Sequence, residues 1–246
     1  MSTVCLSIFH FSSLADRLWV FGQMAYARFP LSQMRDLQFY KLLGSGTEEG
    51  FTPKPNTAVW GMLTVWPDEA TARAHIASEP LFRSWRKRAA ECWTVYLDPI
   101  AAKGKWGGKV PFTANPVDPA APAHDGPMVA LTRAQVKLGA AVRFWNRVPK
   151  ISDMIGKDPN ILFKIGMGET PLFYQMTFSI WPDSKTMAAF ARGDTPHAAA
   201  IKAAYGEKWF VEDFYARFRL LGAEGSWEHK DPLAKAGGSN TLKEAA

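Results

Sequence analysis

Cysteine is scarce in this sequence, and its scarcity excludes several classes of protein. The 246 residues contain two cysteines, Cys5 and Cys92, which are too few for the disulfide framework of a small secreted domain. They form no Cys-x-x-Cys pair for zinc or redox chemistry, and a buried, inert thiol is the simplest interpretation of Cys92. The cysteine content therefore favours a reducing compartment.

Long apolar runs are also missing. No stretch approaches the roughly 18 consecutive apolar residues that a membrane helix requires. Residues 1–11 lack the basic start and the long apolar segment of a secretory signal. We therefore expect a cytoplasmic protein.

Common enzyme and nucleic-acid motifs are absent as well. The sequence has no GxSxG, HExxH, Walker or GxGxxG pattern and no RNA- or DNA-binding signature, so we expect no nucleic-acid partner. Its net charge is +6, and its densest basic cluster is Arg83, Arg86, Lys87 and Arg88. A cluster of this kind is usually a solvated helix face, and the alternative is peripheral contact with an anionic membrane.

An internal duplication is the most informative feature that is present. Matching segments recur in the same order along the two halves, each pair at a similar separation. Val-Trp-Pro-Asp at 65–68 matches Ile-Trp-Pro-Asp at 180–183, residues 103–106 match 224–227, and residues 39–47 match 162–170 with Lys41 aligned on Lys164. The last pair are apolar segments that end in glycines, which we interpret as strands followed by turns.

Each half is predicted to fold in the order β-α-β-β-α-β. In the first half, Ser12 or Ser13 begins a helix that runs to about residue 28, Asp68 caps a second helix, and Pro80 starts its continuation. In the second half, a helix is predicted near 138–148, Asp183 caps another, and Thr195-Pro196 starts a third. The predicted strands lie near 4–11, 37–43, 58–65, 93–97, 128–132, 161–165, 174–180 and 210–220.

This element order is typical of the ferredoxin-like split βαβ unit. Two fused copies can bury the open faces of their sheets against each other, which predicts an α+β fold of tandem ferredoxin-like repeats forming a single-chain version of a dimeric α+β barrel. A flat apolar cofactor has room either between the sheets or between a sheet and its helices. The predicted organisation is a first repeat at 1–110, a proline-rich linker at 111–127, a second repeat at 128–231 and a disordered tail at 232–246.

His197 is the most promising metal-ligand candidate among the five histidines. It follows Thr195-Pro196 and so occupies the second position of a predicted helix, where the positive end of the helix dipole keeps imidazole neutral and able to bind a metal. The alanines at 198–200 leave space for a planar group. A histidine hydrogen-bonded near a helix end is the alternative.

The other histidines carry weaker signals. His10 ends the first predicted strand and either faces the interior or lies at the sheet edge, which makes it the one serious competitor of His197. We expect His75 to be exposed on an amphipathic helix, His124 to lie in the linker and His229 in a polar tail.

Four basic residues lie on predicted strands and helices of the second half. We assign Arg143 and Lys164 to the catalytic set and Arg217 and Arg219 to cofactor binding, where they can pair with cofactor carboxylates. Solvent exposure is the alternative for each of them.

Several segments together resemble the spheroidene monooxygenase family of carotenoid-making bacteria. The similarity extends from about residue 3 to residue 232, and the linker and the tail are the least alike. The segments that carry it are Leu-Ser-Ile-Phe at 6–9, Lys-Leu-Leu-Gly-Ser-Gly-Thr at 41–47, Gly-Phe-Thr-Pro at 50–53, Trp-Thr-Val at 93–95, Leu-Phe-Lys-Ile-Gly at 162–166, Trp-Pro-Asp at 181–183 and Tyr-Ala-Arg-Phe-Arg at 215–219.

The resemblance implies an oxygenase that introduces a keto group at C-2 of acyclic carotenoids such as spheroidene. It also implies haem as the cofactor, reduced ferredoxin as the electron donor and His197 as the axial ligand of the haem iron in the second repeat. Two other hypotheses stay open: a haem enzyme of the same architecture that acts on a small substrate, as a dehydratase or peroxidase does, and a non-catalytic haem or carotenoid carrier.

Overall fold

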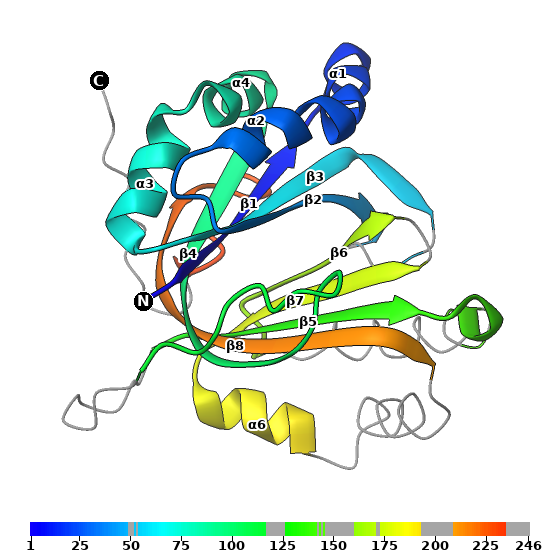
Figure 1. Cartoon of the computed structure of the whole chain (residues 1–246), viewed down its shortest axis with the longest axis vertical. Helices are drawn as coiled ribbons and strands as arrows, with labels where there is room; N and C mark the ends of the chain where they lie inside the picture. Colours follow the sequence, from blue (N-terminus) through cyan, green and yellow to red (C-terminus); the bar gives the residue numbers. More distant parts are fainter. Residues whose placement is uncertain are drawn as a thin grey trace.

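A closed β-barrel forms the centre of the molecule (Figure 1). The computed structural model describes residues 1–48, 52, 54–116, 126–141, 143, 145, 160–170, 173–192 and 209–234. Around the barrel the strands follow the order β1-β3-β2-β6-β7-β5-β8-β4, and every neighbouring pair is antiparallel. The strands are β1 Thr3–His10, β2 Phe39–Gly46, β3 Pro55–Trp66, β4 Glu91–Gly104, β5 Met128–Val136, β6 Phe163–Thr170, β7 Tyr174–Trp181 and β8 Phe210–Gly225.

The strand order repeats in the two halves. The first half runs β4-β1-β3-β2 and the second runs β8-β5-β7-β6, which is the order of a ferredoxin-like sheet in each case. Pairing of β2 with β6 and of β4 with β8 joins the two sheets into one barrel. The predicted α+β fold of tandem ferredoxin-like repeats is therefore confirmed.

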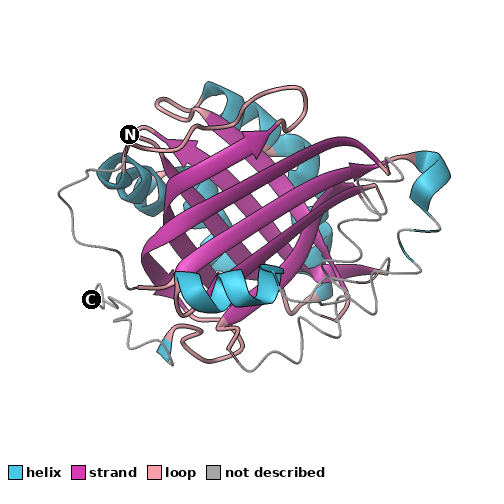
Figure 2. Cartoon of the chain, turned by 90° about the horizontal axis from the view of Figure 1, so that it is seen from below, coloured by secondary structure: helices cyan, strands magenta, loops and turns pink. Residues whose placement is uncertain are grey.

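Helices cover the outside of the barrel unequally. Four of them, α1 Leu14–Tyr26, α2 Arg28–Gln33, α3 Glu69–Ser78 and α4 Pro80–Arg88, lie over the first-half sheet, whereas α6 Ser184–Arg192 lies on the opposite side, against the second half (Figures 1 and 2). Among the described residues, no helix has both the length and the apolar character needed to cross a membrane.

Predicted caps begin three of these helices. The hydroxyl of Ser13 accepts the backbone N–H of Asp16 at 3.1 Å, which satisfies one of the free donors at the start of α1. Asp68 and Asp183 each accept the N–H three residues ahead at 2.7 Å, at the starts of α3 and α6. Of the helix predicted at 138–148, the structure gives a 3-10 turn, η1 Leu138–Ala140, and most of the remainder lies outside the described residues.

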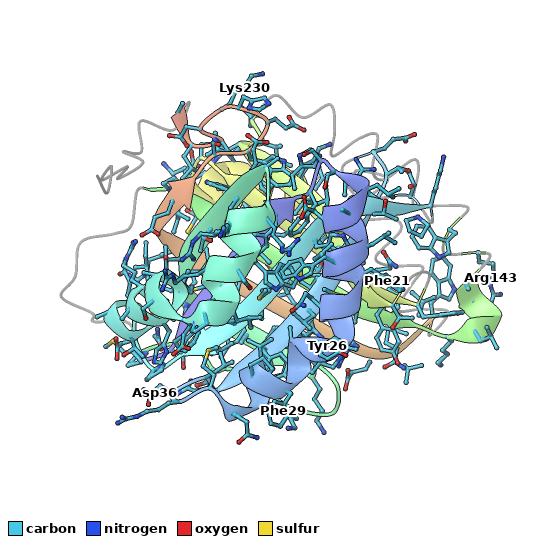
Figure 3. The ribbon with its side chains drawn as sticks, turned by 90° about the horizontal axis from the view of Figure 1, so that it is seen from above. Phe21, Tyr26, Phe29, Asp36, Arg143 and Lys230 are labelled. Atoms are coloured by element: carbon cyan, nitrogen blue, oxygen red, sulfur yellow. The ribbon has the colours of Figure 1, made fainter. Side chains whose placement is uncertain are left out.

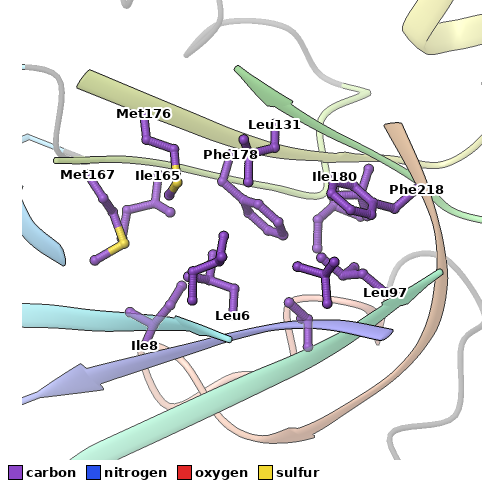
Figure 4. Packing of buried hydrophobic residues seen from close by; sticks show 14 of the residues in the cluster. Leu6, Ile8, Leu97, Leu131, Ile165, Met167, Met176, Phe178, Ile180 and Phe218 are labelled. Carbon is purple, nitrogen blue, oxygen red and sulfur yellow. The ribbon is translucent and has the colours of Figure 1, made fainter. Parts of the chain in front are cut away.

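The barrel interior is a packed apolar core (Figure 4). Leu6 and Ile8 of β1 meet Ile165 and Phe178 from the opposite sheet because alternate residues of each strand point inward. Each such side chain stabilises the fold by about 1.5–3 kcal/mol when fully buried. Since side chains fill this interior, the outer faces of the sheets are left as places for a flat cofactor.

The duplicated tryptophans, Trp66 and Trp181, have structural roles. The indole N–H of Trp66 donates to the Thr64 hydroxyl at 2.9 Å, and that of Trp181 donates to the Ser179 hydroxyl at 3.0 Å. Both tryptophans are buried against the helices that follow them. The sequence repeat thus gives the same buried indole contact in each half.

The glycines at 44, 46, 166 and 168 lie within strands, so their interpretation as turns after strands is wrong. Gly44 of β2 pairs with Gly168 of β6, where the two halves meet. A Cβ on Gly168 would stand 2.0 Å from the carbonyl oxygen of Tyr174, so only glycine allows this approach of β7.

The segments predicted as linker and tail also contribute to the core. Phe112 is buried and packs against Phe214 and Phe218, with ring centroids 5.3 and 5.5 Å apart. Leu233 is buried in the same cluster. Residues 117–125 and 235–246 lie outside the described residues, and the proposed boundaries of the two repeats stay a prediction.

Candidate functional site

The outer faces of the two sheets carry very different side chains. Trp66 pairs with Thr3 and Trp181 pairs with Met128, so the register aligns the two sheets residue by residue. In the first half this face is bulky and apolar, and it is buried under the helices. Leu42, Met62 and Phe9 in the first half correspond to Gly166, Thr177 and Ala134 in the second.

Exposure differs in the same way. Tyr96 of the first half is fully buried, whereas its counterpart Arg217 is exposed. Thr94 is 4% exposed, and its counterpart Tyr215 is 40% exposed. We call the second-half surface the open face. Its Thr132, Tyr215 and Arg217 are exposed, its Lys164, Gly166 and Ser179 are buried, and Thr177 of β7 and Ala130 of β5 are half-buried.

The open face combines small side chains, hydroxyls and two positive charges. Lys164 at one edge is only 9% exposed, and Arg217 stands at the other edge of the same row across the sheet. Partial burial raises the pKa of the Tyr215 phenol, while the neighbouring Arg217 opposes that shift. Such a surface fits a flat, largely apolar group that bears carboxylates, because its small residues leave space and its cations can pair with those carboxylates.

The cofactor-binding and catalytic residues predicted from the sequence fall into three groups. Lys164 and Arg217 share the open face. The strand register aligns Lys164 with Tyr40 of the first half, whereas the sequence repeat aligns it with Lys41. Arg219 is held by Asp98 at 2.9 Å at the β4–β8 junction, so a carboxylate already neutralises it. Arg143 is exposed beyond η1, at the rim of the molecule (Figure 3).

Two histidines were candidates for the metal ligand. His197 lies outside the described residues, in the connection between α6 and β8. His10 ends β1 at the rim of the barrel, on the same side of the strand as Ile8. Among the described residues no group of three His, Cys, Asp or Glu side chains converges on a metal-sized site.

His75 is not on an exposed face, contrary to the sequence prediction. Its side chain is 18% exposed and stacks on Trp66, with ring centroids 4.9 Å apart. Its ring nitrogens lie 3.0 Å from a carboxylate oxygen of Glu79 and 3.6 Å from one of Asp36. His75 therefore fastens α3 to the first-half sheet.

An ion cluster inside one end of the barrel was not anticipated. Glu169 accepts from Lys41 at 2.5 Å and from the Trp106 indole at 2.6 Å, and Arg133 donates to Glu212 at 2.5 Å. Arg133 is 3% exposed, and a guanidinium so deeply buried needs such partners. The sequence feature that could have revealed this cluster is the alternation along β5. Arg133 follows Val129 and Leu131 at every second residue and therefore points into the barrel with them.

The same cluster sets the ionisation of Glu212. Burial alone would raise the pKa of this carboxyl, but the backbone N–H groups of Gly108 and Gly107, together with Arg133, hold it below its usual value. The two N–H donors lie 2.6 and 2.7 Å from the carboxylate oxygens. Because Gly107 and Gly108 belong to the first half, Glu212 joins the two repeats.

These features define a single-chain α+β barrel of two ferredoxin-like repeats whose second sheet carries small and polar side chains on its outer face. The fold occurs in two solved aldoxime dehydratases. One has a TM-score of 0.57 at 10% identity and covers 89% of this chain and 81% of its own. The other, in complex with butyraldoxime, has a TM-score of 0.55 at 8% identity and covers 89% and 79%. At these identities the likeness shows the fold alone.

Curated relatives define the family. A spheroidene monooxygenase of Rhodobacter capsulatus is 54% identical over 95% of this chain and 96% of its own length. The protein of the same name from Cereibacter sphaeroides is 52% identical over 96% of this chain and 72% of its own, and that of Rubrivivax gelatinosus is 34% identical over 87% and 80%. No family model matches the chain. The chain belongs to the spheroidene monooxygenase family.

Proposed function

We propose that this protein is a carotenoid monooxygenase that converts the C-2 methylene of an acyclic carotenoid of the spheroidene type into a ketone. The names of the curated relatives support the substrate class and the reaction. The observation that carries the proposal in this chain is the open face, where small side chains replace the bulky apolar layer of the first half. Haem is the proposed cofactor of this face.

Haem, when bound, supplies the reductive activation of dioxygen. Each of two hydroxylations consumes one O₂, two electrons from reduced ferredoxin and two protons, and releases one water. The resulting geminal diol loses a further water to give the ketone. The chain must therefore hold the polyene end in place, exclude bulk water and deliver protons.

Residues of the open face are assigned to these tasks by their place in the sheet. Arg217 would pair with a haem carboxylate, because it is exposed at the edge of the face. The ammonium of Lys164, which is 9% exposed, would hold a proton at Nζ for the reaction, and Arg143 at the rim would be a second cation. Arg219 is a weaker partner for a haem carboxylate, since Asp98 already neutralises it.

His197 is the proposed axial ligand. The repeat supports this assignment: in the first half the connection between β3 and β4 carries α3 and then α4, which begins at Pro80 and packs on the outer face of its sheet. The sequence predicts a corresponding helix start at Thr195-Pro196, between β7 and β8. We therefore assign His197, which the sequence predicts in the first turn of that helix, to the cofactor of the open face.

The direct test is turnover by purified protein. Spheroidene, reduced ferredoxin and ¹⁸O₂ should yield a ketone whose oxygen carries the label, with the assay kept short to limit exchange with water. Omitting ferredoxin or oxygen should abolish the product. A protein with a Soret band that forms no ketone would favour a haem enzyme of another substrate or a carrier, and a protein without haem would contradict the cofactor assignment.

A further inference from the structure

Helices α1 and α2 expose a row of large apolar side chains to solvent. Figure 3 shows Phe21, Tyr26 and Phe29 following one another along these helices on the helix-covered side of the molecule. Leu14 and Leu18 extend the row at helical spacing toward the start of α1. The row, which we call the apolar stripe, is exposed by 72% at Leu14, 66% at Leu18, 67% at Phe21, 78% at Tyr26 and 74% at Phe29.

The apolar stripe is not needed to hold the helices on the barrel. Val20 of α1, Leu31 of α2 and Ala27 between the two helices are buried and belong to the cluster that packs on the first-half sheet. Helices α1 and α2 are thus apolar both on the side that faces the sheet and on a side that faces solvent. Several large apolar side chains exposed on neighbouring helices are typical of an interaction site.

Basic residues border the apolar stripe. Arg28 is exposed on α2, Arg35 is exposed in the turn that follows α2, and α4 adds the exposed Arg83 and Lys87. Asp16 is the one acidic residue at 14–35, and Arg88 of α4 pairs with it at 3.0 Å. Asp36 follows directly and lies 3.6 Å from Arg35, so Arg28, Arg83 and Lys87 carry the positive charge of the border. The border is therefore cationic, which favours an anionic partner.

The basic cluster on α4 contributes charge to this surface but no apolar contact. Phe82 and Trp85 are fully buried beneath α4, so the aromatic side chains of that helix cannot enter a lipid layer. Arg86 is also occupied, because it donates to the carbonyl oxygens of Ile76 and Ala77. The apolar contact must come from α1 and α2.

A groove begins beside the apolar stripe. It has a volume of about 320 Å³ and is lined by Phe21 and Met24 of α1, by Trp60 of β3 and, on the far side, by Gly168 and Gln175. Gln175 belongs to β7, two residues before Thr177 of the open face. The groove therefore leads from the apolar stripe across the β2–β6 seam toward the second-half sheet.

We propose that the apolar stripe and its basic border form a docking surface for an anionic lipid bilayer. Interfacial helices bind in this way, with apolar side chains in the acyl boundary and Lys or Arg at the headgroups. A second copy of this chain fits less well, because an isologous contact would place the basic border against itself. The role of the groove as a route for a polyene leaving the bilayer rests on the proposed function, whereas lipid docking does not.

Flotation with vesicles tests the docking surface without carotenoid or turnover. The protein should float with vesicles of phosphatidylcholine and phosphatidylglycerol, and less so at high salt or with phosphatidylcholine alone. The double variant Leu18→Gln/Phe29→Gln should bind at least about tenfold more weakly, because both side chains leave the acyl boundary. Arg83→Gln/Lys87→Gln should weaken binding by about fivefold per charge at low salt only.

Leu138→Gln is the matched control, since Leu138 is 79% exposed on η1 and should leave vesicle binding unchanged. Unchanged thermal unfolding would establish that Leu18→Gln/Phe29→Gln is folded, and it should still form ketone from detergent-dispersed carotenoid. Equal flotation of this variant and the unmodified protein, or no flotation of either, would overturn the proposal. A dimer in sedimentation that the double variant dissociates would assign the stripe to a second copy instead.

Discussion

Lys164 is a buried cation at the edge of a face built largely of small and hydroxyl side chains. Its neighbour across the strands is Ser179, which is also buried, and the adjoining positions are Gly166 and Ala130. A buried lysine on the outer face of a sheet is a candidate functional residue, because burying an ammonium costs free energy.

Replacing Lys164 with Met keeps the aliphatic stem and removes the proton at Nζ. We expect ketone formation to fall by about 100-fold, the usual loss for a general acid, while the Soret band persists. Absorption spectra and product chromatography measure the two effects on one sample. Lys103→Met, at an exposed position of β4, is the control. Unchanged turnover in Lys164→Met would remove this residue from the catalytic set.

Single residues were predictable where the signal is local. Ser13, Asp68 and Asp183 cap helices because their side chains accept N–H groups two or three residues ahead, which spacing alone reveals. The burial of His75 was not predictable, because it depends on Trp66 and Asp36, which precede its helix. The pairing of Arg219 with Asp98 likewise joins the two halves across the barrel.

At the scale of elements, the two sheets share one register and differ in what covers them. The first-half outer face packs Met62 and Phe9 against helices, and the second half carries Thr177 and Ala134 at those positions. The element order could be predicted from the duplication. The difference in side-chain size between the two outer faces can be recognised only when the strand register is known.

Thr177→Met with Ala134→Phe would give the second-half sheet the bulk of the first. We expect a folded protein that loses haem, because the added side chains fill the space above the sheet. Near-ultraviolet circular dichroism and the Soret band separate folding from binding. The mirror change Met62→Thr should destabilise the fold by about 2 kcal/mol and leave haem in place. Full haem content in the filled variant would place the cofactor elsewhere.

Strands β4 and β8 are longer than the sequence pattern predicts. They extend to Gly104 and Gly225, whereas the predicted strands end at residues 97 and 220. The two strands pair with each other through register shifts, so their length follows from closure of the barrel. The local periodicity of the sequence does not reveal how the barrel closes.

For the molecule as a whole, the ion cluster at one end of the barrel ties the repeats together. Glu212 receives N–H groups from Gly107 and Gly108 of the first half and Arg133 of the second. Glu212→Gln should lower the free energy of unfolding by about 3 kcal/mol, because it leaves Arg133 buried without its closest carboxylate. Urea unfolding at neutral pH measures the loss.

The pH dependence of stability has a definite sign. The folded pKa of Glu212 lies below its unfolded value of about 4.3, so its contribution is present above that pH and is lost as pH falls through the folded pKa. Glu212→Gln should therefore flatten the acid side of the stability profile, whereas Glu48→Gln at an exposed position should not. If the free energy of unfolding falls equally with decreasing pH in Glu212→Gln and in the unmodified protein, this account is contradicted.

The central claim places haem on the second repeat, with His197 as its ligand, and one spectrum tests it most directly. His197→Ala should remain folded, lose or strongly shift its Soret band, and recover a Soret band when imidazole is added. His10→Ala should keep a normal Soret band, because His10 stands at the rim of a packed barrel. A normal spectrum in His197→Ala together with a lost band in His10→Ala would contradict the account and move the cofactor to the first repeat.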